Sequence, residues 1–119
     1  MDNSKARTVF TYDVPPSIST HVTSVGVRML TVAEEQQVHK KSGNDNLKAG
    51  NELVKTSLVE AIIDGVETQL KLSDGSVDTF WNEAPPPLRQ LIATAYHDIN
   101  MAKDEEVRPF LASRKSKVG

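Results

Sequence analysis

The sequence predicts one α+β domain that combines an N-terminal β segment, two capped helices, a β-hairpin and a proline-initiated amphipathic core helix. Thr31 and Glu34 have the spacing of a capping box, which begins a helix. Asp64-Gly65 is a two-residue turn between β-prone segments, which is typical of a hairpin. After the prolines at 85–87, apolar residues recur at helical spacing and form one stripe: Leu88, Leu91, Ile92, Ala95, Tyr96 and Ile99.

The N-terminal β segment is expected to hold two strands. Residues 8–14 read TVFTYDV, a β-prone run with alternating character, and a proline pair ends it. Val25, Val27 and Met29 alternate with polar or small residues, which suits a half-buried strand. Gly26 interrupts this strand and indicates a bulge.

The first helix is expected to begin at Val32 and to end at Gly43. Lys40 and Lys41 lie in its last turn, where the helix dipole favours cations. Gly43 suits a C-cap in the left-handed αL conformation. The apolar stripe of this helix is thin, so we expect it to face solvent mostly or to lie against a partner.

A second helix is expected from about Asn46 to about Leu58, with Asn44 or Asp45 as its N-cap. Gly50 in the helix interior suggests the close approach of another backbone. The expected inner face consists of Leu47, Gly50, Leu53, Val54, Ser57 and Leu58.

The hairpin is expected to pair residues 59–63 with residues 66–72. A helical period that continues through Ala61 and Ile62 is the alternative, but the Asp64-Gly65 turn favours the hairpin. The first strand is short and rich in Val and Ile, and the second alternates apolar with polar side chains.

A short helix is expected between the hairpin and the core helix. Ser76 can cap it, and it should run through Trp81. The prolines that follow have a fixed φ and no N–H, so they fit only the first turn of the core helix. One last helical turn is expected around Val107, Phe110 and Leu111.

Length and composition bound the domain organisation. With 119 residues the chain suits a single domain, which we place at 8–112 between a polar tail at 1–7 and a basic tail at 113–119. Aromatic residues make up 5%, so the core must be largely aliphatic. Hydrophobic residues make up only 38%, which suggests that assembly supplies part of the stability.

Charge and cysteine content argue against several function classes. The net charge of −2 disfavours electrostatic nucleic-acid binding, which normally needs a basic surplus. No apolar run is long enough to cross a membrane. The absence of cysteine excludes disulfides, thiolate zinc sites and a cysteine nucleophile.

No motif for catalysis or for cofactor binding is present. His21, His39 and His97 are scattered, without a partner at metal-ligand spacing. The serines lack a nucleophile elbow, and the glycines do not form a phosphate-binding loop. We therefore expect neither an enzyme nor a cofactor or metal.

Two groups of residues are candidates for binding a partner protein. Phe80 and Trp81 form an aromatic pair of the kind used as interface anchors, although core packing explains them as well. Arg114, Lys115 and Lys117 lie in the basic tail. Such polar tails cannot offset their own ordering entropy, so neighbouring subunits must supply the contacts wherever the tails are ordered.

Five segments resemble small tail-morphogenesis proteins of bacteriophages, both tail-assembly-chaperone-like proteins and small tail or baseplate proteins. They are LTVAEE (30–35), ELVKTSLVEAIIDG (52–65), DGSVDTFW (74–81), LRQLIATAY (88–96) and FLASRKSKVG (110–119). The resemblance covers roughly residue 29 to the end, and its motifs are packing and capping patterns.

The resemblance implies no enzyme and no cofactor, and it implies other tail or baseplate proteins as partners in a multi-subunit assembly. We expect a structural subunit of the virion tail, assembled in the host cytoplasm. A chaperone that binds the tape-measure protein and is absent from the finished particle is the alternative. A small nucleic-acid-binding regulator that uses the 88–100 helix ranks lower, because that helix has only Arg89 as a cation.

Overall fold

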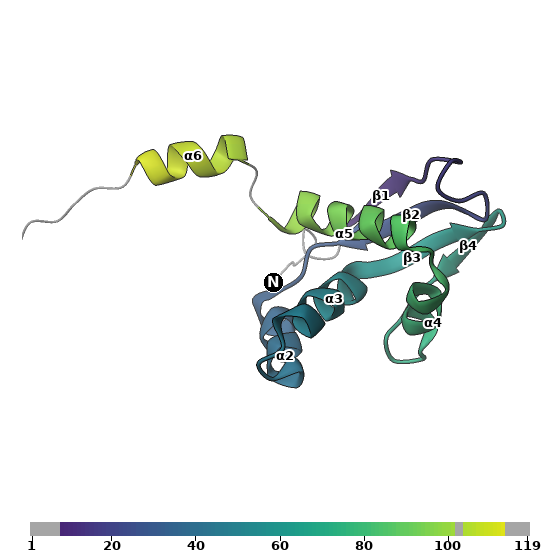
Figure 1. The fold of residues 1–119 in the computed structure, drawn as a ribbon, viewed down its shortest axis with the longest axis horizontal. Helices are drawn as coiled ribbons and strands as arrows, with labels where there is room; N and C mark the ends of the chain where they lie inside the picture. Colours follow the sequence, from purple (N-terminus) through teal and green to yellow (C-terminus); the bar gives the residue numbers. More distant parts are fainter. Residues whose placement is uncertain (1–7, 102–103, 114–119) are drawn as a thin grey trace, which may run out of the picture.

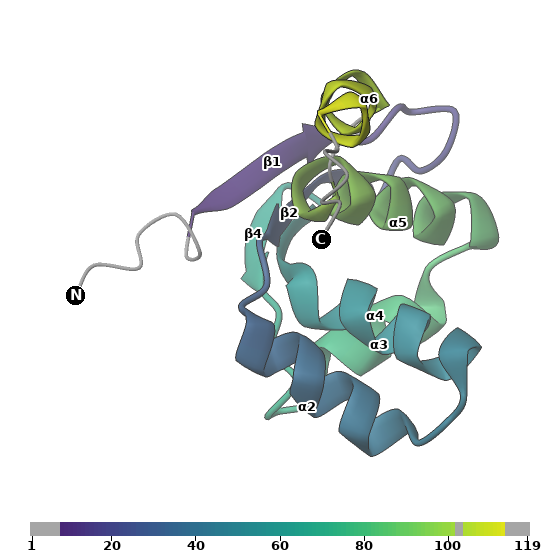
Figure 2. The same ribbon diagram turned by 90° about the vertical axis from the view of Figure 1, so that its left-hand side faces the viewer.

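A computed structural model describes residues 8–101 and 104–113, and it confirms the α+β fold (Figure 1). The strands form one antiparallel sheet in the order β1-β2-β3-β4: β1 (Val9–Asp13), β2 (Val22–Arg28), β3 (Leu58–Ile63) and β4 (Val66–Gln69). The helices are α2 (Val32–Ser42), α3 (Asn46–Ser57), α4 (Ser76–Glu83), α5 (Pro86–Asn100) and α6 (Asp104–Ala112). In Figure 2 the sheet lies on one side of the domain, α3, α4 and α5 lie on the other, and α2 packs outside α3.

The bulge expected at Gly26 is confirmed. The β2–β3 register shifts between Gly26 and Val27, and it shifts again near the start of β2. A Cβ at Gly26 would lie 2.4 Å from Cγ of Glu60 and 2.8 Å from Cγ1 of Val9, so a side chain does not fit there. Glycine therefore lets the neighbouring side chains close over the outer face of the sheet.

The hairpin is also confirmed, although its second strand is shorter than expected. Asp64 has φ +50° and Gly65 has φ +81°, and positive φ at both central positions is the mark of a type I′ turn. β4 ends at Gln69 instead of residue 72. The N–H of Lys71 bonds to the hydroxyl of Ser76, which draws the chain away from the sheet edge.

The helix α2 begins as the sequence predicts, but its C-cap differs. The Thr31 hydroxyl accepts from the Glu34 N–H, and the Glu34 carboxylate accepts from the Thr31 N–H, which completes the capping box. Gly43 has φ +62° and ψ −127°, so the expected αL conformation is wrong although φ is positive. The chain turns directly into the next helix, because the Asp45 N–H bonds to the carbonyl of Ser42.

The inner face expected for α3 is wrong in its first turns. Asp45 caps the helix by accepting from the Lys48 N–H. Leu47 is 78% exposed, and Gly50 faces open space where we expected a close backbone. Ala49 is buried in their place, so the inward face is rotated in these turns. Towards its C-terminal end, α3 buries Val54 and Ser57 as expected.

The two helices that complete the core meet at the proline run. Gly75, with φ +77°, takes the N-cap position of α4, so the assignment of Ser76 as the cap is wrong. The Ser76 hydroxyl instead bonds to Lys71 and Asp74 across the preceding turn. In α5, which begins after Pro85, most of the predicted stripe is buried: Leu88, Ile92, Ala95 and Tyr96.

Candidate interaction site

Phe80 and Trp81 lie in the core. Both side chains are 8% exposed and pack in the same cluster as the stripe of α5. They share the buried face of α4 with Val77, which belongs to the same cluster. The pair therefore fills the interior of the domain, and its assignment as a surface anchor for a partner does not fit this conformation.

The basic candidates Arg114, Lys115 and Lys117 lie outside the described residues. The described chain ends just before them, after α6. The structure therefore assigns no contact to these three side chains.

The feature that the sequence analysis underestimated is α6. In place of one turn, the structure has a helix of nine residues. Val107, Phe110 and Leu111 are spaced i, i+3 and i+4, so they share one face. Phe110 is 74% exposed and Leu111 is 62% exposed.

α6 stands clear of the sheet and of the other helices (Figure 1). The molecule is accordingly elongated, with extents of 62 × 33 × 30 Å. Acidic residues at the start of α6 suit the helix dipole, but Pro109 in its interior lacks the N–H that a helix needs there. The sequence signal was present in the apolar spacing, and Pro109 obscured it.

A cavity of about 300 Å³ lies where the start of β2, the hairpin turn and the α4–α5 junction meet. His21 and Asp64 stand at its mouth, with Nδ1 and Oδ1 2.7 Å apart. The two side chains are 79% and 67% exposed. The Asp64 N–H also donates to the carbonyl of His21, so the pair fastens the hairpin turn to β2.

The chemistry available to this cavity is limited. A histidine–carboxylate pair can accept a proton when it is positioned on a nucleophile. The nearby Ser19 hydroxyl accepts instead from the Val22 N–H. His39 and His97 lie on α2 and α5 and do not line this cavity. Among the described residues, no group of three or more His, Cys, Asp or Glu side chains could hold a metal ion.

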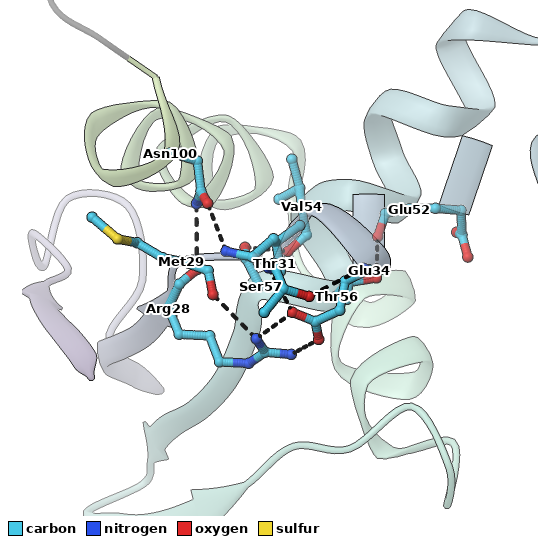
Figure 3. Close-up of polar contacts among 10 residues, drawn as sticks. Arg28, Met29, Thr31, Glu34, Glu52, Val54, Thr56, Ser57 and Asn100 are labelled. Carbon is cyan, nitrogen blue, oxygen red and sulfur yellow. Dashed lines mark hydrogen bonds and ion pairs between the residues drawn. The ribbon is translucent and has the colours of Figure 1, made fainter. Parts of the chain in front are cut away.

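A network of polar contacts joins the end of β2 to the start of α2 and to the C-terminal end of α5 (Figure 3). The Arg28 guanidinium donates to both carboxylate oxygens of Glu34, at 2.9 and 2.5 Å. The Asn100 side chain accepts from the Leu30 N–H and donates to the carbonyls of Arg28 and Tyr96. The hydrogen bonds from Arg28 lower the pKa of Glu34 to about 2.

This network is structural in character. Arg28 bonds to the Glu34 carboxylate and to the carbonyl of Met29, and Asn100 bonds only to backbone groups. Glu34 also lines a hollow between α2 and α3. The network fixes the C-terminal end of α5, and hence the point from which α6 departs.

The Tyr12 hydroxyl donates to the Asp98 carboxylate at 2.5 Å, beside a shallow apolar hollow between β1 and α5. Burial of the hydroxyl and the carboxylate contact raise the pKa of Tyr12 to about 12. The contact joins the edge strand to the core helix. It therefore holds β1 in place at the rim of the sheet.

Within the described residues, no helix is long and apolar enough to cross a membrane. Comparison with known proteins found no matching family model, no matching curated protein and no matching solved structure.

Proposed function

We propose that the protein is a non-enzymatic protein–protein interaction subunit of a phage-type tail or baseplate assembly. The observation that carries the proposal is the exposed apolar face of α6. Phe110 and Leu111 are largely exposed on a helix that stands apart from the domain (Figure 1). A face of this kind is suited to a partner groove, where an amphipathic helix buries its i, i+3 and i+4 residues.

Energetics support this reading of α6. An isolated helix of nine residues is marginal in water, because helix nucleation is unfavourable. Burial of a Phe or Leu side chain contributes about 1.5–3 kcal/mol. A partner that covers Phe110 and Leu111 would therefore stabilise the helix that presents them.

The other candidate residues of the described chain have structural roles, which leaves α6 as the candidate binding surface. The aromatic pair of α4 is used for the core, and the histidine–aspartate pair fastens a turn. The phage-tail assignment rests on the resemblance of the five segments named above. The tape-measure chaperone remains the alternative, since α6 serves equally well to hold a partner during assembly.

Mass spectrometry of particles purified from the phage or prophage that encodes the chain tests the proposal. A structural subunit is expected in purified particles at a fixed ratio to the other tail proteins. A chaperone is expected to be absent from particles but to co-purify with the tape-measure protein from the lysate. If the protein is found in neither fraction, the proposal is overturned.

A further inference from the structure

β1 is an edge strand, and within residues 8–101 and 104–113 the only strand that pairs with it is β2. The Val14 N–H donates to the carbonyl of Thr23, which fixes the hydrogen-bond phase of the β1–β2 ladder. Because inward and outward backbone groups alternate along an antiparallel strand, Phe10 and Tyr12 bond to β2. Val9, Thr11 and Asp13 therefore direct their N–H and C=O groups away from the sheet.

The two edges of the sheet differ in how well they are protected. Natural edge strands are usually short, charged, or interrupted by proline or lysine. β4 has four residues and carries Glu67 at an outward position. β1 has five residues, VFTYD, and its one charged side chain, Asp13, stands at the end of the strand. It has neither proline nor lysine, and Val9 and Phe10 are each 37% exposed. β1 is therefore the edge open to strand addition.

We propose that β1 pairs in antiparallel fashion with β1 of a second copy of this chain, about a two-fold axis at Thr11. In this register the outward groups of Thr11 meet those of the second copy's Thr11. Val9 meets the second copy's Asp13, whose backbone groups also face outward. The pairing joins two four-stranded sheets into one continuous sheet.

The sequence of β1 is complementary to itself in this register. Phe10 lies opposite the second copy's Tyr12, an aromatic cross-strand pair of the kind that stabilises sheets. Asp13 lies opposite Val9, so the carboxylates of the two copies do not face each other. This complementarity favours a second copy over a strand of another protein.

The surface used here is separate from α6. The dimer therefore goes beyond the proposed function, and it would form whether or not α6 binds a partner. Its failure would leave the proposed function standing, and the converse also holds.

Sedimentation equilibrium of the full chain tests the dimer. Thr11→Pro removes an outward N–H and leaves the β1–β2 ladder intact, so we expect a monomer. The matched control is Glu67→Pro, which removes an outward N–H from the other edge strand and should leave the dimer unchanged. A wild-type dissociation constant above about 1 mM, or a dimer that persists in Thr11→Pro, overturns the proposal.

Cross-linking covers the case in which a proline variant does not fold. The chain has no cysteine, so Thr11→Cys introduces a single thiol. Paired residues in an antiparallel ladder have Cα atoms about 5.5 Å apart, within the range that a disulfide spans. Mild oxidation should yield a covalent dimer of Thr11→Cys but not of Glu67→Cys. Equal yields, or no dimer from Thr11→Cys, overturn the proposal.

Discussion

Glu34 acts twice at the start of α2. One carboxylate oxygen closes the capping box on the Thr31 N–H, and the carboxylate also receives two hydrogen bonds from Arg28. The capping box could be predicted from the sequence, because its partners are three residues apart. The link from Arg28 and the Asn100 contacts could not, since they depend on where the end of β2 meets the end of α5.

The ion pair predicts a defined pH dependence. The folded-state pKa of Glu34 is about 2, below its ordinary value of 4.5, so the charged form is favoured in the folded state. This stabilisation is complete above about pH 5 and is lost as the pH falls through 4.5 towards 2. The side chains of Arg28 and Glu34 are both partly exposed, so solvent screens the ion pair. We therefore expect the charge of Glu34 to contribute about 1–3 kcal/mol to the free energy of unfolding at pH 7.

Glu34→Gln keeps the cap acceptor and removes the charge. In urea unfolding at pH 7, the free energy of unfolding of Glu34→Gln should be lower than that of wild type by about 1–3 kcal/mol. This difference in free energy should shrink as the pH approaches 2. A difference that stays constant between pH 7 and pH 2 would show that the charge on Glu34 does not stabilise the fold.

Gly26 provides a second prediction at this scale. Gly26→Ala places a Cβ against Glu60 and Val9 and should cost about 1–3 kcal/mol in urea unfolding. Gly50→Ala is the control, because Gly50 faces open space in a helix and the change should stabilise by about 0.5–1 kcal/mol. Equal effects at the two glycines would contradict the close packing at the bulge.

At the scale of elements, the order of the strands, the hairpin turn and the starts of α2, α3 and α5 were predictable because short-range chemistry fixes them. The cap of α4 and the end of β4 were not, since the Ser76 hydroxyl bonds to Lys71 across the preceding turn. Which face of a helix points inward was harder to predict. The period of α3 placed Leu47 and Gly50 inward, but Ala49 is the buried residue in these turns of α3, which packs against α2. A helix of modest apolar content admits more than one inward face, and only tertiary contacts choose between them.

The α5 stripe gives a graded prediction. Ile92 is fully buried, and Ile92→Ala should cost about 2–5 kcal/mol. Leu91 packs at the edge of the core and is only half-buried, so Leu91→Ala should cost less, about 1–2 kcal/mol. Thermal unfolding of the two variants checks the order. A larger loss at Leu91 would mean that the stripe is rotated about the helix axis.

At the scale of the whole molecule, the candidate site was only partly predictable. The sequence marked the aromatic pair as either core or interface, and the fold places it in the core. The exposed apolar face lies instead on α6, where Pro109 weakened the helical signal. Exposure depends on the position of α6 relative to the domain, which no local pattern encodes.

The central claim is that the α6 face binds a partner and contributes nothing to the stability of the domain. Phe110→Ser combined with Leu111→Ser tests it, with Leu47→Ser as the control, because Leu47 is equally exposed on α3. Both variants should melt within about 2 °C of wild type, since surface substitutions have small effects.

Under the proposed function, the decisive measurement is the amount of each variant retained with its partners when it replaces the wild-type chain in the phage or prophage that the proposal expects to encode it. Quantitative mass spectrometry of purified particles and of tape-measure complexes from the lysate gives this amount. We predict that the α6 double variant is lost from whichever fraction contains the wild-type protein, while Leu47→Ser is retained. Retention of the α6 variant at the wild-type level would contradict the account.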